Sequence, residues 1–256
     1  MRKLLASVVA FAILQGAAPA GDMPALRVLV VGNSLTYVND LPAMVEAVAA
    51  QAGLKGRVTC RAIARPDFGL EEHWTDGRAV EAIRAGRWTH VVLQQGPSSL
   101  PESEAVLRTY TRKFAFEARA RGAIVGLYSV WPPLSRFGAF DAVTASYAHA
   151  AQDVGGLLVP VGEAWRAAWR RDQLLGLYGA DGFHPSPIGT YLAALVFFER
   201  LTGRSVLGLP DPSASRERAL ADVHLTPAQL AALQEAAAEA GRRSAGGGDG
   251  RSPRVQ

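Results

Sequence analysis

The chain has 256 residues, 49% hydrophobic and 20% charged, which is long enough to bury a sizeable core. Its formal net charge of +4 comes from its two ends, because residues 21–241 carry 21 Lys and Arg against 22 Asp and Glu. A body with a net charge of about −1 offers no basic stripe for phosphate contacts, so nucleic acid is not an expected partner.

The first 20 residues have the pattern of a signal peptide. Arg2 and Lys3 precede an apolar run over residues 4–14, and Ala18-Pro19-Ala20 forms a cleavage site of the A-x-A type. The apolar run is shorter than the ~20 residues that a membrane-spanning helix needs. We therefore expect cleavage after Ala20 and an exported protein, periplasmic or secreted, whose mature chain has no integral membrane segment.

The middle of the chain alternates between short apolar, β-branched runs and helical patterns. Strands are predicted at residues 28–31, 57–64, 88–93, 123–130 and 156–161, and helices at residues 39–51, 70–85, 101–121, 140–153, 163–171 and 187–201. This alternation is typical of a parallel five-stranded sheet covered by helices on both faces, a three-layer α/β/α fold.

The pattern changes beyond residue 205. Residues 206–241 are predicted to form a C-terminal extension with a helix at 226–240, and the Gly-, Arg- and Ser-rich residues 242–256 a disordered tail.

A serine stands where the first predicted strand ends. Gly32 ends the apolar run, and Asn33, Ser34 and Leu35 form the turn before the next helix. In open α/β sheets the chemistry lies at the carboxyl ends of the strands, where N–H groups of a helix start can bind an anion. Taken alone, this segment is better explained as an ordinary turn with N-cap residues.

A second polar motif lies far along the chain. Asp181 and His184 stand three residues apart in a loop that contains Gly and Pro and precedes the last apolar helix. Serine becomes a strong nucleophile when a base removes its proton and a third group fixes the tautomer of that base. Ser34, Asp181 and His184 supply these three roles, and the alternative for His184 is an ordinary loop histidine.

Together, GNSL at residues 32–35 and DGFHPS at residues 181–186 resemble the blocks of the SGNH, or GDSL-like, hydrolase family. The resemblance covers roughly residues 27–201 and implies a flavodoxin-like catalytic domain over residues 21–205. It also implies a Ser34, Asp181 and His184 triad, and an oxyanion hole that uses the N–H groups of Ser34 and Gly69. A glycine placed at position 69 only for its backbone angle is the alternative.

The family's third block, Gly-x-Asn-Asp, is missing from the chain. Gly96 matches its glycine, and Ser98 falls where its asparagine belongs. Because the loss of one oxyanion donor typically costs ~10²–10³ in rate, a substitute donor is expected. We favour Gln95 over Ser98, and a turn with solvated glutamines at positions 94 and 95 is the alternative.

The sequence predicts neither a metal nor another cofactor. Cys60 is the only cysteine and fits a buried thiol, and the five histidines show no metal-binding spacing. Trp131, which follows the fourth strand, lines a substrate pocket or, more simply, packs in the core. The Trp165 and Trp169 pair is also typical of packing.

The resemblance and the expected export favour hydrolysis of carboxylic esters in a small molecule or a polysaccharide, for example O-acetyl groups on carbohydrate. Two other functions fit the same fold. One is a non-hydrolytic carbohydrate-binding or remodelling protein, and the other is a lipase or lysophospholipase.

Overall fold

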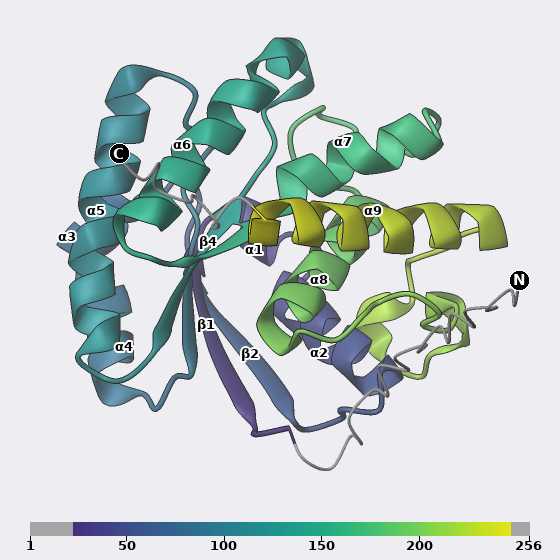
Figure 1. The fold of residues 1–256 in the computed structure, drawn as a ribbon, viewed down its shortest axis with the longest axis horizontal. Helices are drawn as coiled ribbons and strands as arrows, with labels where there is room; N and C mark the ends of the chain where they lie inside the picture. Colours follow the sequence, from purple (N-terminus) through teal and green to yellow (C-terminus); the bar gives the residue numbers. More distant parts are fainter. Residues whose placement is uncertain (1–22, 247–256) are drawn as a thin grey trace, which may run out of the picture.

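Five strands form one parallel sheet in the order β2-β1-β3-β4-β5 (Figure 1). The computed structural model describes residues 23–246, so the predicted signal peptide lies outside the described residues. The strands are β1 Leu26–Gly32, β2 Val58–Ala64, β3 His90–Leu93, β4 Ile124–Ser129 and β5 Leu157–Pro160. The side chains of β1 from Val28 to Val31 are buried on both faces, as expected for a central parallel strand.

Helices cover both faces of this sheet and confirm the predicted α/β class (Figure 1). One face carries α3 Leu70–Asp76, α4 Arg78–Ala85, α5 Pro101–Arg119 and α6 Phe140–Asp153. The other carries α2 Leu41–Gln51, α7 Val161–Arg171, α8 Pro187–Thr202 and α9 Pro227–Gly246. Shorter helices are α1 Ser34–Tyr37, η1 Leu134–Ala139, η2 Pro212–Ala214 and η3 Arg218–Leu220. No helix among residues 23–246 is long and apolar enough to cross a membrane.

Backbone conformation explains two of the differences from the predicted helix boundaries. The single helix predicted over residues 70–85 is two helices, because Gly77 has a φ of 83° and breaks the chain between α3 and α4. Helix α2 begins at Leu41 because Asn39 and Asp40 have φ values of 59° and 51°. The left-handed region excludes both residues from a right-handed helix.

The C-terminal extension packs on the body of the domain. Helix α9 contacts α7 and α8, and Leu233, Ala236 and Ala237 are fully buried. On its outer side, Glu239 forms ion pairs with three arginines: Arg170, Arg171 and Arg243. These contacts continue the helix to Gly246, so residues 242–246 are helical where the sequence predicted disorder. The rest of the predicted tail lies outside the described residues.

Of the aromatic residues and the cysteine that the sequence singled out, Trp131, Trp165 and Cys60 are in the core and Trp169 is half-buried against it. Trp131 is fully buried and stacks on Trp165 with ring centroids 3.7 Å apart, which supports the packing interpretation of both. Cys60 is also buried, and burial raises the pKa of its thiol. A buried neutral thiol is a poor nucleophile, so Cys60 has a packing role.

Candidate active site

Ser34 is the first residue of α1, and only Asn33 separates it from the end of β1 at Gly32. Asn33 is the N-cap: its Oδ1 accepts a hydrogen bond from Leu35 N at 3.1 Å, and its Nδ2 donates to Phe68 O at 3.0 Å. Ser34 lines a cavity of about 310 Å³ together with both aromatic and polar residues, among them Phe68, Gly69, Gln95, Gly96 and Phe183. The turn therefore presents Ser34 to a cavity at the carboxyl edge of the sheet.

The side chain of Gln94 holds this turn against the end of β3. Its Oε1 accepts hydrogen bonds from Asn33 N at 2.8 Å and Thr36 Oγ1 at 2.9 Å. Its Nε2 donates to Asn33 Oδ1 at 2.9 Å and to Gln95 O at 2.6 Å. A Cβ at position 32 would collide with the Gln94 amide and the Thr36 hydroxyl, so the turn requires Gly32. Because Gln94 is fully buried and Gln95 nearly so, the solvated-glutamine alternative is wrong.

His73, which the sequence analysis did not select, supports the same turn from α3. Its Nε2 donates to the carbonyl oxygen of Gly32 at 2.7 Å, since a carbonyl only accepts. The imidazole is fully buried, and its Nδ1 has no hydrogen-bond partner among residues 23–246. Burial lowers the pKa of His73. The neutral imidazole of His73 therefore anchors the backbone at Gly32, two residues before Ser34, through this hydrogen bond.

Asp181 and His184 form a tight pair in the loop before α8. Asp181 Oδ1 accepts hydrogen bonds from the N–H groups of Phe183 and His184, each at 2.9 Å. Asp181 Oδ2 lies 2.5 Å from His184 Nδ1. The hydrogen bond from His184 lowers the pKa of Asp181 to about 2. A carboxylate only accepts hydrogen bonds, so Nδ1 carries the proton and Nε2 is left with a free lone pair.

The Ser34 and His184 loops meet at the carboxyl edge of the sheet. Asn39, five residues after Ser34, donates from Nδ2 to Pro185 O at 2.9 Å and to Thr190 Oγ1 at 3.0 Å. Phe183 lines the same cavity as Ser34. Within the described part of the chain, no hydrogen bond joins Ser34 Oγ to His184. Proton transfer requires these groups to approach to about 2.6–3.2 Å, and catalytic hydrogen bonds are often longer before substrate binds.

The expected oxyanion donors line this cavity, but two of them already have partners. Gly69 N donates to Glu72 Oε2 at 2.8 Å. Gln95 Nε2 donates to Ser98 Oγ at 2.9 Å and to Ser103 O at 3.2 Å, which uses both amide hydrogens. The N–H groups of Ser34 and Gly96 have no hydrogen-bond partner among residues 23–246. Neither of these N–H groups is therefore committed to another acceptor in the described part of the chain.

The resemblance to the SGNH hydrolases gives the Gly69 N–H group an oxyanion role, and from that expectation neutralising Glu72 should raise the turnover of an ester substrate. The Glu72 carboxylate accepts the Gly69 hydrogen that an oxyanion needs, and its negative charge opposes the charge that develops there. A hydrogen bond to a charged group contributes about 1.5–3 kcal/mol and one between neutral groups about 0.5–1.5 kcal/mol. Glutamine still accepts from Gly69 N but weakens this contact by about 1 kcal/mol, so Glu72→Gln should raise kcat about threefold to tenfold. Steady-state kinetics on p-nitrophenyl acetate measures the change, with the neighbouring exposed Glu81→Gln as the matched control. A fall in kcat would mean that Glu72 orients Gly69 for catalysis.

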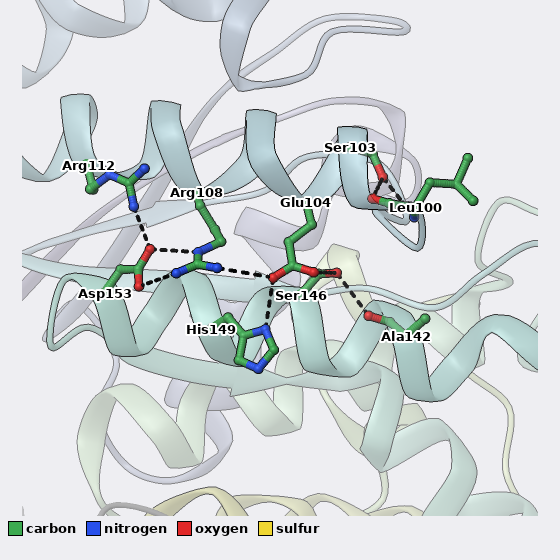
Figure 2. Close-up of polar contacts among 9 residues, drawn as sticks. All are labelled: Leu100, Ser103, Glu104, Arg108, Arg112, Ala142, Ser146, His149 and Asp153. Carbon is green, nitrogen blue, oxygen red and sulfur yellow. Dashed lines mark hydrogen bonds and ion pairs between the residues drawn. The ribbon is translucent and has the colours of Figure 1, made fainter.

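A second group of serine, histidine and carboxylate residues lies between α5 and α6 (Figure 2). Glu104 contacts His149 Nδ1 at 2.9 Å, and Ser146 Oγ donates to Glu104 at 3.4 Å and to Ala142 O at 3.0 Å. The carboxylate lies between the hydroxyl and the imidazole, so His149 cannot take the serine proton. Asp153 extends the network through ion pairs with two arginines of α5: Arg108 and Arg112. This network joins two helices and has no triad geometry.

The described residues contain no group of three or more His, Cys, Asp or Glu side chains that could hold a metal ion.

Comparisons with known proteins place the chain in a family. No protein-family profile and no curated protein matches the chain. Among solved structures, a protein assigned to the SGNH hydrolases, from Slackia heliotrinireducens, is 30% identical and aligns with a TM-score of 0.59. That alignment covers 69% of this chain and 99% of the other.

Two further structures share the fold at lower identity. A DUF4886 family protein from Bacteroides uniformis is 19% identical over 84% of this chain and 94% of its own, with a TM-score of 0.66. A variant of an acetyl-xylooligosaccharide esterase from a Geobacillus species is 13% identical over 70% and 95%, with a TM-score of 0.55.

Proposed function

Because the chain belongs to the SGNH hydrolase family of ester-acting hydrolases, we propose that it is a serine esterase that uses Ser34, His184 and Asp181. The observation that supports this most strongly is the Asp181–His184 pair. The hydrogen bond to Asp181 fixes the proton on His184 Nδ1 and leaves Nε2 as the base. The preceding residue, Phe183, lines the same cavity as Ser34.

In the proposed reaction, Ser34 Oγ attacks the ester carbonyl while His184 Nε2 takes the hydroxyl proton. The imidazolium is stabilised by Asp181 and then gives the proton to the leaving alcohol as the ester C–O bond breaks. Water hydrolyses the acyl-enzyme with His184 again as base, which releases the acid and restores the Ser34 hydroxyl.

The oxyanion is stabilised first by the free N–H groups of Ser34 and Gly96. Gly69 joins them once its hydrogen bond to Glu72 is released. Gln95 joins only if its amide leaves Ser98 and Ser103.

The proposed substrate is a short-chain ester, with O-acetyl groups on carbohydrate as the first class to examine. The cavity beside Ser34 is small, about 310 Å³, and much of its lining is turn and loop residues. The fold is also shared with an acetyl-xylooligosaccharide esterase. The leader pattern in residues 1–20 supports an exported enzyme, which fits a polysaccharide substrate.

One observation favours a lipase as the second candidate. A cavity of about 430 Å³ lies beyond the catalytic loop, and most of its lining side chains are apolar: Leu134, Phe137, Trp169, Leu175, Leu177 and Tyr178. Leu134 N donates to Gly182 O at 2.8 Å, so this cavity adjoins the loop that carries Asp181 and His184. A long acyl chain that crosses this contact would be buried in an apolar environment.

Covalent labelling and ester chain length test the proposed function. A fluorophosphonate probe is expected to modify Ser34, as read by mass spectrometry of the labelled peptide, and to abolish hydrolysis of p-nitrophenyl acetate. Turnover of the acetate above that of p-nitrophenyl decanoate supports the short-chain esterase, and the reverse order supports the lipase. Absence of both labelling and turnover would leave the non-hydrolytic carbohydrate-binding alternative.

A further inference from the structure

A cationic cavity lies at the amino edge of the sheet. Its volume is about 620 Å³, and its lining residues include the first residues of three strands: Leu26 of β1, His90 of β3 and Ile124 of β4. Ser34 follows the opposite end of β1, which is seven residues long and therefore about 20 Å from edge to edge. In Figure 1 the two edges lie at opposite ends of β1. The cavity is thus distinct from the candidate active site.

Three arginines give this cavity its charge. Arg27, Arg87 and Arg121 line it, and among residues 23–246 no Asp or Glu does. Arg27 Nε donates to the carbonyl oxygen of Arg87, which holds one guanidinium at the wall. Within the described part of the chain, none of the three forms an ion pair, whereas most arginines on the helices do. The three arginines therefore give the cavity a local charge of +3, although residues 21–241 as a whole have a net charge of about −1.

The rest of the lining is partly aromatic and apolar. Trp88 Nε1 donates to Ala82 O at 2.8 Å, which fixes the ring, and a Cβ at Gly86 would collide with that ring. Ile124 is 54% exposed beside it, although it begins a core strand. Cavities of about 300–1,000 Å³ are the size of small-molecule sites, so this one has room for more than an inorganic anion.

We propose that this cavity binds an anionic saccharide, whose carboxylate groups pair with Arg27, Arg87 and Arg121 and whose apolar ring face packs on Trp88. Guanidinium groups bind carboxylates bidentately, and an indole ring offers an apolar surface with little conformational freedom to lose. Three arginines are too few for a nucleic-acid interface, which needs a longer array of phosphate contacts. A concave site also fits a sugar unit better than it fits the flat surface of a membrane.

This second site goes beyond the proposed esterase activity, because binding there does not require Ser34. An enzyme bound to an acidic polysaccharide through the arginine-lined cavity would stay close to that polymer. The Ser34 cavity would then meet the esters of the polymer at a high effective concentration.

Isothermal titration calorimetry on the full-length protein tests the proposal, with oligogalacturonate as the carboxylated probe and xylo-oligosaccharide of equal length as the neutral probe. The oligogalacturonate is expected to bind and the neutral probe to bind at least tenfold more weakly. Arg87→Gln/Arg121→Gln should weaken oligogalacturonate binding by at least tenfold. Arg61→Gln/Arg216→Gln, which removes two other exposed, unpaired arginines, should change it less than twofold.

Several outcomes would overturn the proposal: no binding of oligogalacturonate, equal weakening by both double variants, or equal affinity for inorganic phosphate. Binding to phosphatidylglycerol vesicles through Arg87 and Arg121, without binding of the saccharide, would instead identify a membrane-surface site. Ser34→Ala should bind the saccharide normally, and the Arg87/Arg121 variant should hydrolyse p-nitrophenyl acetate normally. Failure of the proposed esterase activity is therefore distinguishable from failure of the proposed saccharide site.

Discussion

Ser34→Ala and His184→Ala are each expected to lower kcat on p-nitrophenyl acetate by about 10³-fold or more. The first variant removes the attacking oxygen, and the second removes the base whose Nε2 is left free by the bond between Nδ1 and Asp181. Residues of a triad act as a unit, so the double variant should lose little more than either single one. Steady-state kinetics with active-site titration measures all three values.

The matched controls for this prediction are Ser135→Ala and His224→Ala, both at exposed positions away from the Ser34 cavity. Each should keep kcat within about twofold, as surface substitutions usually leave stability and structure intact. Near-normal turnover of either active-site variant would remove that residue from the mechanism. Additive losses in the double variant would show that Ser34 and His184 act independently.

The sheet was predictable because its strands are short apolar runs separated by helical patterns. The run at residues 28–31 predicted a buried strand, and β1 lies between two neighbours in the sheet. The helix boundaries were less predictable because they depend on single backbone angles. Asn and Asp adopt positive φ more readily than other non-glycine residues, but the helix periodicity over residues 39–51 outweighed this signal at Asn39 and Asp40. Gly77 carried the corresponding signal for the break between α3 and α4.

The residues proposed for chemistry could be selected from local motifs, but the residues that hold them in place could not. Asn39 reaches Pro185 across 146 residues, and His73 reaches Gly32 across 41. A single sequence carries no information about such pairings. Glu72 was missed for another reason: a glutamate in the first turn of a helix is an ordinary capping residue, and its effect on Gly69 arises from the role proposed for that N–H group.

Gln94 is the case where a signal existed and was misread. It follows the buried strand β3 directly, and a central strand carries its burial to its last residue. The pair of glutamines instead suggested a turn. Gln95 was favoured as the substitute oxyanion donor because its amide has the same chemistry as the missing asparagine. The structure separates the positions of the two glutamines: Gln95 lines the cavity, and Gln94 holds the turn that carries Ser34.

Gln94→Leu is expected to lower the free energy of unfolding by roughly 2–5 kcal/mol and to reduce kcat/KM on p-nitrophenyl acetate. Leucine is similar in size but leaves the Asn33 N–H and the Thr36 hydroxyl without an acceptor, and each buried unsatisfied group costs about 1–3 kcal/mol. Urea unfolding measures the stability loss, and Gln173→Leu at an exposed position should change it by less than about 0.5 kcal/mol.

A second substitution at position 94 separates turn geometry from general destabilisation. Gln94→Glu keeps the acceptor for Asn33 N and Thr36 Oγ1 but loses the donor to Asn33 Oδ1 and Gln95 O. If the acceptor positions Ser34, this variant should recover more kcat/KM than its stability predicts, measured well below its unfolding transition. Equal kcat/KM in the Leu and Glu variants, at equal folded fraction, would mean that the amide contributes to stability alone. The Leu and Glu variants differ because a carboxylate still accepts from Asn33 N and Thr36 Oγ1, which leucine cannot do. The carboxylate also repels Asn33 Oδ1 and Gln95 O, to which the amide nitrogen of Gln94 donates.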